Sequence, residues 1–320
     1  MEYQKNLREA WGQALLALAR RNPDVVALEA DLGKSTRSIL MKGEFPERCF
    51  EMGIAEQDMA STAAGLALAG KIPFMHSFAV FASGRAYDQL RNSVCIPHVA
   101  VRVCGSSAGL SDFGDGKTHQ ALEDMAIMRA LPNMTVLCPA DGIECAGMVA
   151  ALETWPGPAY VRINRNDLPF VTPPDRPYRI GPAVVLRRGG VEPRPRGSDA
   201  VVFACGVMVS RALEAADLLR PAGISTTVVN VSTLKPIDRA TIVECARGVR
   251  AIVTAEEHSV IGGLGSAVLE ALRLERHAPL EMVGVQDRFG LSAADYDGLL
   301  AHFGLTAEAI ERTVRALLNA

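Results

Sequence analysis

The side chains with the widest range of chemistry gather in one glycine-rich stretch, residues 105–120. This stretch carries Asp112, Asp115, Lys117 and His119, and it holds too many glycines to pack as a regular helix or strand. A flexible surface loop is one interpretation, but a connection of this length inside a compact domain is uncommon and usually functional. A histidine near carboxylates can transfer protons or bind sugar hydroxyls, so we predict a functional loop here.

Two further groups precede this loop. Glu56 stands where a loop enters an apolar, small-residue helix predicted over residues 59–69. In isolation it is a first-turn carboxylate that complements the helix dipole, which is worth about 0.3–1 kcal/mol. Phe78 and Phe81 lie three residues apart, and they are either core aromatics or a pair of rings able to sandwich a flat heterocycle.

The elements that must position these groups follow from the hydrophobic pattern. Apolar residues at positions 7, 11, 15 and 18 predict a helix over Leu7–Arg21. Strands separated by helices indicate an α/β fold with parallel sheets covered on both faces. The strands are predicted at residues 25–28, 98–103, 134–137, 159–163, 201–204, 226–229 and 251–253, and later helices at 210–219, 239–245, 264–272 and 307–317.

A change in composition divides the chain. Nine of the 18 prolines fall within the 40 residues from Pro156 to Pro195. Proline lacks a donor N–H and disfavours a helix before it, so the later part of this stretch is predicted to be extended, with a hairpin near Gly189-Gly190. We therefore predict two three-layer α/β/α domains with mostly parallel sheets, at residues 1–170 and 198–320, joined by a linker at 171–197.

In an open parallel sheet, ligands bind outside the carboxyl ends of the strands. The predicted strands place three loops at that edge of the first sheet, at residues 31–36, 104–119 and 163–167. The chemistry of residues 105–120 is therefore expected at the ligand-binding edge.

Composition excludes several classes of protein. The formal charge is −3 and the pI is near 6.1, so the chain has no basic stripe for nucleic acid. No apolar run reaches the roughly 18 residues that a membrane span requires, and the polar N-terminus shows no signal peptide, so we expect a cytoplasmic protein. Seven scattered cysteines fit reduced thiols, and the six histidines lack the spacing of a zinc site, so no metal ligands are predicted in this chain.

Five segments resemble the transketolase family in order and spacing. They are Ala-Asp-Leu-Gly-Lys-Ser (30–35), Gly-Ile-Ala-Glu-Gln-Asp-Met (53–59), Ser-Phe-x-x-Phe (77–81), Asp-Gly-Lys-Thr-His-Gln (115–120) with its continuation to residue 134, and Asn-Arg (164–165). The match covers the whole chain as a pyrimidine-binding domain followed by a transketolase C-terminal domain. The chain is thus similar to the C-terminal subunit of a split, two-chain transketolase.

The resemblance implies thiamine diphosphate as the cofactor, which works through a carbanion-stabilising ylid. By similarity, Glu56 hydrogen-bonds a pyrimidine ring nitrogen, and Ile54, Phe78 and Phe81 complete the pocket around the ring. The family holds Mg²⁺ and the diphosphate on the preceding domain, through Gly-Asp-Gly and an asparagine. The only Gly-Asp-Gly here, at residues 114–116, belongs to the Thr-His-Gln loop. An N-terminal transketolase subunit must therefore supply the Mg²⁺ site, and we expect a heterotetramer of two of each chain.

Substrate contacts also carry over by similarity. Asp115 and His119 match family residues that hold sugar hydroxyls, and His119 is predicted to be catalytic together with Glu56. Arg8, Ser35 and Arg165 match positions that bind a sugar phosphate, where an arginine fork can bind two oxygens. The sequence departs from the family at Cys104-Gly105, where a histidine is usual, and in the residues 111–114 that lengthen the loop. The resemblance therefore does not identify the donor or the acceptor sugar.

The implied activity is transfer of a two-carbon ketol unit from a ketose to an aldose, either of which can be a phosphate ester. One alternative is the beta subunit of a 2-oxoacid dehydrogenase, which has the same length and layout, although the Asp-Gly-Lys-Thr-His-Gln loop argues against it. 1-Deoxyxylulose 5-phosphate synthase, normally one long chain, is a weaker alternative. A non-catalytic scaffold subunit is the remaining one, and the presence of Glu56, Phe81 and His119 argues against it.

Overall fold

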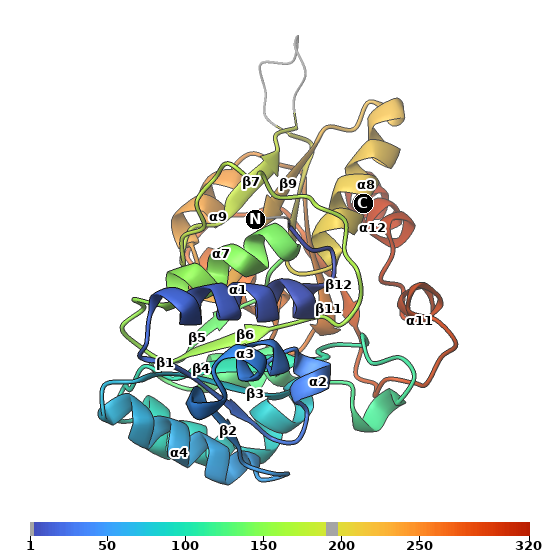
Figure 1. The fold of residues 1–320 in the computed structure, drawn as a ribbon. Helices are drawn as coiled ribbons and strands as arrows, with labels where there is room; N and C mark the ends of the chain where they lie inside the picture. Colours follow the sequence, from blue (N-terminus) through green and yellow to red (C-terminus); the bar gives the residue numbers. More distant parts are fainter. Residues whose placement is uncertain (1–2, 190–197) are drawn as a thin grey trace.

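The computed structural model describes residues 3–189 and 198–320. Two β-sheets with helices on both faces make up the chain, as Figure 1 shows. Each half therefore has three layers, which confirms the predicted α/β/α fold with mostly parallel sheets. None of the described helices combines the length and apolar character needed to cross a membrane.

The first sheet has seven strands in the order β10-β5-β6-β4-β3-β1-β2, and every pair except β10 with β5 is parallel. Its central strands are buried along their whole length, as expected for a parallel sheet covered on both faces. The strands are β1 (Val25–Glu29), β2 (Cys49–Glu51), β3 (Ile72–Phe78), β4 (Arg102–Ser106), β5 (Thr135–Leu137), β6 (Ala159–Arg162) and β10 (Thr233–Lys235).

Helices on both faces of the first sheet complete its three layers. Helix α1 (Leu7–Arg21) lies beside α7 (Gly142–Leu152) on one face, and the short α2 (Gly33–Thr36) and α3 (Ile39–Glu44) also contact α1 (Figure 1). Helix α1 has the predicted bounds: the Asn6 side chain caps its start by accepting from the Glu9 N–H. The opposite face carries α4 (Glu56–Leu68), α5 (Tyr87–Gln89), α6 (Asp124–Ala130) and two short π-helical segments, Phe81–Arg85 and Leu90–Cys95.

The second sheet has five strands in the order β12-β11-β8-β9-β7, with β7 antiparallel at its edge. Helices α8 and α12 pack together on one face, and α9 and α10 on the other. The elements are β7 (Val184–Arg187), β8 (Ala200–Ala204), β9 (Thr226–Asn230), β11 (Ala251–Ser259), β12 (Leu280–Val285), α8 (Met208–Leu219), α9 (Arg239–Ala246), α10 (Leu264–Leu272), α11 (Tyr296–His302) and α12 (Ala307–Asn319).

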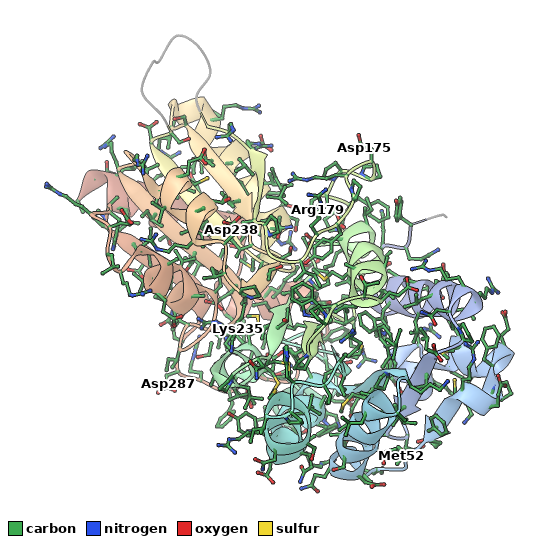
Figure 2. The ribbon with its side chains drawn as sticks, turned by 90° about the vertical axis from the view of Figure 1, so that its left-hand side faces the viewer. Met52, Asp175, Arg179, Lys235, Asp238 and Asp287 are labelled. Atoms are coloured by element: carbon green, nitrogen blue, oxygen red, sulfur yellow. The ribbon has the colours of Figure 1, made fainter. Side chains whose placement is uncertain are left out.

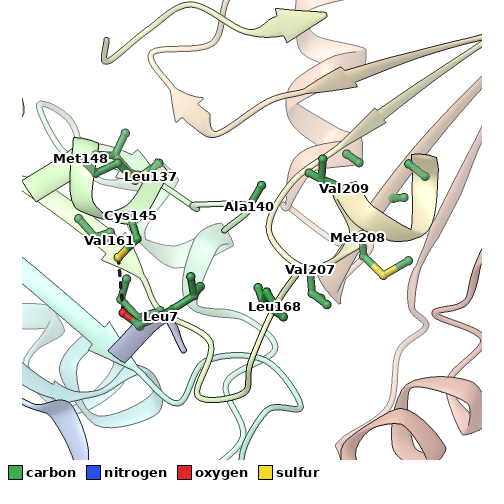
Figure 3. Close-up of a cluster of buried hydrophobic side chains, with 14 of the residues drawn as sticks. Leu7, Leu137, Ala140, Cys145, Met148, Val161, Leu168, Val207, Met208 and Val209 are labelled. Carbon is green, nitrogen blue, oxygen red and sulfur yellow. Dashed lines mark hydrogen bonds between the residues drawn. The ribbon is translucent and has the colours of Figure 1, made fainter. Parts of the chain in front are cut away.

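The two domains pack directly against each other. Strand β10 follows the second domain's β9 in the chain but pairs with β5 of the first sheet. In Figure 2, Lys235 of this strand lies at the junction, where its ammonium group donates to the Arg129 carbonyl at 2.9 Å. Buried apolar side chains continue across the boundary, with Ala140 and Leu168 facing Val207 in Figure 3. The domains are therefore joined by a common hydrophobic core.

Several predicted elements differ from the observed ones. The strand expected at residues 98–103 begins at Arg102 instead, because His98 adopts a left-handed φ of 58° that ends the preceding turn. Strand β3 was not predicted, since its end is polar and aromatic. The expected linker contains β7, which pairs with β9, and the rest of its described part runs along the side of the molecule past Asp175 and Arg179 (Figure 2). The expected hairpin at Gly189-Gly190 extends beyond the described residues.

The glycine-rich turn before α10 has a structural role. The Glu256 carboxylate accepts hydrogen bonds from the backbone N–H groups of Leu264 and Gly265, at 2.6 and 2.9 Å. A Cβ atom on Gly263 would lie 1.9 Å from Glu256 Oε2, so only glycine allows this approach. The protein's own carboxylate thus satisfies the helix N-terminus that a nucleotide phosphate would otherwise bind.

Candidate active site

Four central strands of the first sheet end at one edge. Strands β1, β3, β4 and β6 are parallel neighbours, so their carboxyl ends lead into adjacent loops. The Ala108 N–H donates to the Ile163 carbonyl at 3.1 Å, which joins the loop after β4 to the one after β6. The three loops predicted at this edge therefore do meet there, with one revision: residues 33–36 form the short helix α2.

Glu56 is the first residue of α4 and is almost completely buried, with 1% exposure. Gly53, with a φ of 69°, turns the chain into the helix. The Ser77 hydroxyl at the end of β3 donates to Glu56 Oε1 at 3.1 Å. Arg85 Nη1 donates to Oε2 at 2.8 Å, although the Arg85 side chain is 43% exposed. A buried carboxylate is thus held between a hydroxyl and an accessible cation.

An aromatic wall stands beside this carboxylate. The rings of Phe78 and Phe81 are nearly parallel, with centroids 6.2 Å apart and an interplanar angle of 13°. A third ring between them would need roughly 7 Å, twice the carbon contact distance, so the pair does not form the sandwich considered from the spacing. His119 lies edge-on to both rings, 5.5 Å from Phe81 and 6.2 Å from Phe78, and the Arg85 guanidinium lies over the Phe81 ring at 4.6 Å. The wall brings three predicted site residues together.

A cluster of arginines lies near the end of β1. Arg8 Nη1 donates to the backbone carbonyl of Ser35 at 3.1 Å, so Ser35 meets Arg8 through its main chain. Burial lowers the pKa of Arg8, and the nearby Arg165 and Arg37 guanidinium groups lower it further. The structure therefore brings Arg8, Ser35 and Arg165 together, as the resemblance implied.

Asp112 contributes an unexpected negative charge to this cluster. Arg165 Nη1 lies 2.5 Å from Asp112 Oδ1, and the Asp112 side chain is buried. Its other oxygen, Oδ2, has no hydrogen-bond partner among residues 3–189 and 198–320. One of the predicted anion-binding arginines is thus neutralised by a residue of the lengthened loop.

Two other predicted residues are exposed. Ile54, two residues before Glu56, has 74% of its surface accessible. Asp115 is exposed at the tip of the 105–119 loop, and His119, which closes the short turn Gly116–Thr118, is partly exposed. Cys104, by contrast, is fully buried within β4, where burial raises the pKa of its thiol well above the usual value. It does not reach the site.

Glu29 organises the loop that carries Ser35. Its Oε1 accepts from the hydroxyls of Thr36 and Ser38 at 2.5 and 2.8 Å, and its Oε2 accepts from the Leu32 N–H at 3.0 Å. Glu29, Leu32 and Ser38 border a cavity of about 450 Å³ between α3 and β2. Burial raises the pKa of the Glu29 carboxyl to about 7, against the opposing effect of these donors.

This pKa predicts a pH-dependent stability. The folded chain binds the Glu29 proton more tightly than the unfolded chain, so the associated stability is present below about pH 4.5 and is lost as the pH rises to about 7. Glu29→Gln removes this dependence. We expect the free energy of unfolding of the variant, relative to wild type, to rise by on the order of 1–3 kcal/mol between about pH 5 and pH 8. Urea unfolding at both pH values measures it.

The exposed carboxylate of Glu47 provides the control, because its side chain is 68% exposed. Glu47→Gln should give the same difference from wild type at both pH values. A Glu29→Gln difference that stays constant with pH would show that Glu29 is ionised in the folded chain throughout.

Comparison with known proteins identifies the family. The model of the transketolase pyrimidine binding domain matches residues 4–171, and that of the transketolase C-terminal domain matches residues 189–310. The chain belongs to the transketolase family. It corresponds to the C-terminal section of a split transketolase, as its relatives show.

Its similarity to split transketolases covers both chains almost completely. A putative transketolase C-terminal section of Methanocaldococcus jannaschii is 38% identical, over 97% of this chain and 95% of that one. A 6-deoxy-6-sulfo-D-fructose transketolase subunit of a Clostridium species is 39% identical, over 96% and 92%. A solved split-gene transketolase, described as an inactive beta4 tetramer, is 44% identical with a TM-score of 0.87, covering 98% of each chain. The transketolase of Campylobacter jejuni shares the fold at 21% identity and a TM-score of 0.82, with 98% of this chain covering 47% of that one.

The transketolase motifs did not reveal every residue of the site. Arg85 follows Phe81 by four residues, a spacing that places both on one side of a helical turn, and this signal was available in the sequence. Asp112 was recognised only as part of the loop. Its pairing with Arg165 depends on two loops 53 positions apart in the sequence, and no local pattern indicates it.

Proposed function

We propose that this chain is the C-terminal subunit of a thiamine-diphosphate-dependent transketolase. It transfers a two-carbon ketol unit from a ketose donor to an aldose acceptor, and it acts only with an N-terminal subunit. The observation that carries this proposal is the buried Glu56 carboxylate beside the Phe78–Phe81 wall and His119, at the ligand-binding edge of the sheet. Family membership supplies the reaction class.

The residues present fit the aminopyrimidine end of thiamine diphosphate. A flat ring packs against apolar side chains. Phe78 and Phe81 form an aromatic wall for it, and Ile54 is exposed and therefore available for contact. Its ring nitrogen needs a buried carboxyl group, and Glu56 is almost completely buried. When bound, the cofactor supplies the electron sink for cleavage of the carbon–carbon bond beside the ketone.

The remaining chemistry belongs to the protein. Glu56 holds a proton at the pyrimidine nitrogen, and Ser77 fixes its carboxyl orientation. His119, packed edge-on against the aromatic wall, binds a sugar hydroxyl and moves a proton there, and the exposed Asp115 binds a second hydroxyl. These contacts hold the sugars in a reactive position, which lowers the entropic part of the barrier.

The proposed need for a partner rests on the way the family divides the cofactor site between two domains. An N-terminal transketolase subunit supplies the Mg²⁺ and diphosphate site, and we propose a heterotetramer of two of each chain. The solved split-gene relative, described as an inactive beta4 tetramer, supports the view that chains of this type are insufficient alone.

Reconstitution tests the proposal. The purified chain is assayed alone and mixed with its N-terminal partner, with thiamine diphosphate and Mg²⁺ present, for ketol transfer from xylulose 5-phosphate to ribose 5-phosphate. Unphosphorylated and sulfonated ketoses serve as further donors. We expect activity only in the mixture, and size determination should show two copies of each chain.

Other outcomes would replace the proposal. Decarboxylation of pyruvate with an artificial electron acceptor, without ketol transfer, would indicate a 2-oxoacid dehydrogenase subunit. Assembly without thiamine diphosphate binding would indicate a scaffold subunit. Ketol transfer by this chain alone would contradict the requirement for a partner.

The arginine cluster yields a prediction on substrate charge. Arg165→Met should raise the KM of the reconstituted complex for a phosphorylated aldose by roughly 10-fold to 100-fold, the value of a charge-assisted hydrogen bond. Asp112→Asn should lower the same KM several-fold, because it frees Arg165 from its carboxylate partner. Initial rates at varied aldose concentration measure both effects.

The unphosphorylated form of the same aldose is the control, since it lacks the charge. Neither variant should change its KM by more than about two-fold. Equal effects on the phosphorylated and unphosphorylated sugar would show that Arg165 shapes the loop and does not bind the phosphate.

A further inference from the structure

The loop that carries Asp115 and His119 is held by the second domain. Residues 109–121 form a loop whose neck is closed by two hydrogen bonds between Gly109 and Ala121, at 2.9 and 3.2 Å. Further along the loop, the Phe113 carbonyl accepts from the Ala293 N–H at 2.9 Å, and Gln120 Nε2 donates to the Leu291 carbonyl at 2.9 Å. The second domain therefore contacts the loop at its middle and at its end.

The second domain also contacts the loop at its neck. Glu257, on β11 of the second domain, accepts the Leu110 N–H at Oε1 over 2.8 Å. The Tyr296 hydroxyl donates to the same oxygen at 2.8 Å, and Asn164 Nδ2 donates to Oε2 at 3.2 Å. Arg162 Nη1 lies 3.7 Å from Oε2 and supplies a positive charge. One buried carboxylate thus joins the loop after β4, the loop after β6 and helix α11.

The backbone of the neck is adapted to this carboxylate. Gly109 has a φ of 65°, and a Cβ atom there would lie 2.5 Å from the Glu257 carboxyl carbon. Glycine is therefore needed both for the turn and for the close approach. The Glu257 side chain has 2% exposure, so water cannot replace the contact without local opening.

We propose that Glu257 is a positioning residue for ketol transfer: it fixes the neck of the 109–121 loop and so places Asp115 and His119 against the sugar. This inference rests on the proposed function. It gives the C-terminal domain a role in substrate binding although the sheet edge that carries the site belongs to the first domain.

The test compares Glu257→Ala with Glu256→Ala. The neighbouring Glu256 is equally buried on the same strand, but among the described residues its carboxylate accepts hydrogen bonds from the N-terminus of α10 and lies 3.7 Å from His258 Nδ1, all within its own domain. Both variants lose a buried carboxylate, and thermal unfolding measures the stability that each loses. Only Glu257→Ala frees the loop, so the two variants differ in the contact under test.

Kinetics of the reconstituted complex give the first readout. Glu257→Ala should lower kcat/KM for the sugars by roughly 10-fold to 100-fold, chiefly through a higher sugar KM, because a misplaced contact costs about this much. Affinity for thiamine diphosphate should change less than about two-fold, because Glu56, Phe78 and Phe81 are untouched. Glu257→Gln retains the Oε1 acceptor for Leu110 and should recover most of the loss. Equal sugar kinetics in the Glu257→Ala and Glu256→Ala complexes would overturn the proposal.

Hydrogen exchange of the chain without its partner gives the second readout, which does not depend on catalysis. The Leu110 amide and its neighbours in residues 109–121 should exchange at least about ten-fold faster in Glu257→Ala than in wild type and in Glu256→Ala. Wild-type exchange rates in Glu257→Ala would overturn the proposal that Glu257 holds the loop. If the wild-type complex transfers no ketol unit, the proposed function fails and this exchange result still decides whether Glu257 holds the loop.

Discussion

Replacing Glu56 with glutamine will leave the two-chain complex assembled and will lower its turnover by roughly two to four orders of magnitude. Glutamine keeps the shape and can still accept from Ser77, but it cannot hold or exchange the proton that the mechanism places on this side chain. It also ends the ion pair with Arg85. Steady-state ketol transfer at saturating sugar and thiamine diphosphate measures the loss, and calorimetry measures retained cofactor binding.

Glu144 provides the matched control for this change. It is another buried glutamate of the first domain, but its carboxylate accepts from Asn230 at 2.9 Å and from the Ala140 N–H at 2.8 Å, in the contact between the two domains. Glu144→Gln should reduce stability without reducing turnover. A near-wild-type turnover in Glu56→Gln would contradict the proton-transfer role, and loss of assembly would show that Glu56 is structural.

The parts of the fold that could be predicted are those in which a local pattern carries the whole signal. Helix α1 was predicted with its exact bounds from its apolar spacing alone, and in the structure the Asn6 cap and the last-turn residues Arg20 and Arg21 favour the same bounds. Strand β4 was predicted to begin four residues early, since Val99 and Val101 are apolar and buried although they precede the strand. Arg102 is the first residue of β4, and its buried guanidinium donates to three backbone carbonyls.

Strands that depend on tertiary partners were not predicted. Strand β10 is three residues long and exists because it pairs with β5 of the other domain. Strand β7 lies in a proline-rich stretch, and its residues become a strand by adding to the edge of β9. Pairing of this kind joins distant segments, and a window of sequence contains only one of the two partners.

The candidate site divides in the same way. The motifs identified Glu56, Phe78, Phe81 and His119, and the structure brings these four side chains to one place. The residues that hold them in place were not evident, because they come from distant segments. Glu257, for example, lies 147 positions from the Leu110 amide that it binds. Local motifs thus predict a chemistry for the site, whereas the positions of its side chains depend on contacts that the fold creates.

The largest expected effect on stability concerns the pair behind the loop neck. Arg162 Nε donates to both Asp124 oxygens, at 3.1 and 3.0 Å, and both side chains are at most 4% exposed. Within the described part of the chain, Arg162→Met leaves the buried Asp124 charge with the Tyr160 hydroxyl as its one side-chain donor, and it removes the donor to the Glu257 carbonyl. We expect the free energy of unfolding to fall by about 3–5 kcal/mol. Urea unfolding followed by circular dichroism measures it.

A double variant separates the loss of the pair from the loss of packing. Arg162→Met combined with Asp124→Leu removes both charges, so it should be more stable than Arg162→Met alone by at least about 1 kcal/mol. The exposed pair of Arg20 and Glu44 has an even shorter contact of 2.7 Å, and Arg20→Met should unfold like wild type, because solvent screens that pair. If the double variant loses as much stability as Arg162→Met and Asp124→Leu lose together, the charges of the pair do not stabilise each other. Arg162 would then contribute through its apolar stem and its carbonyl contacts alone.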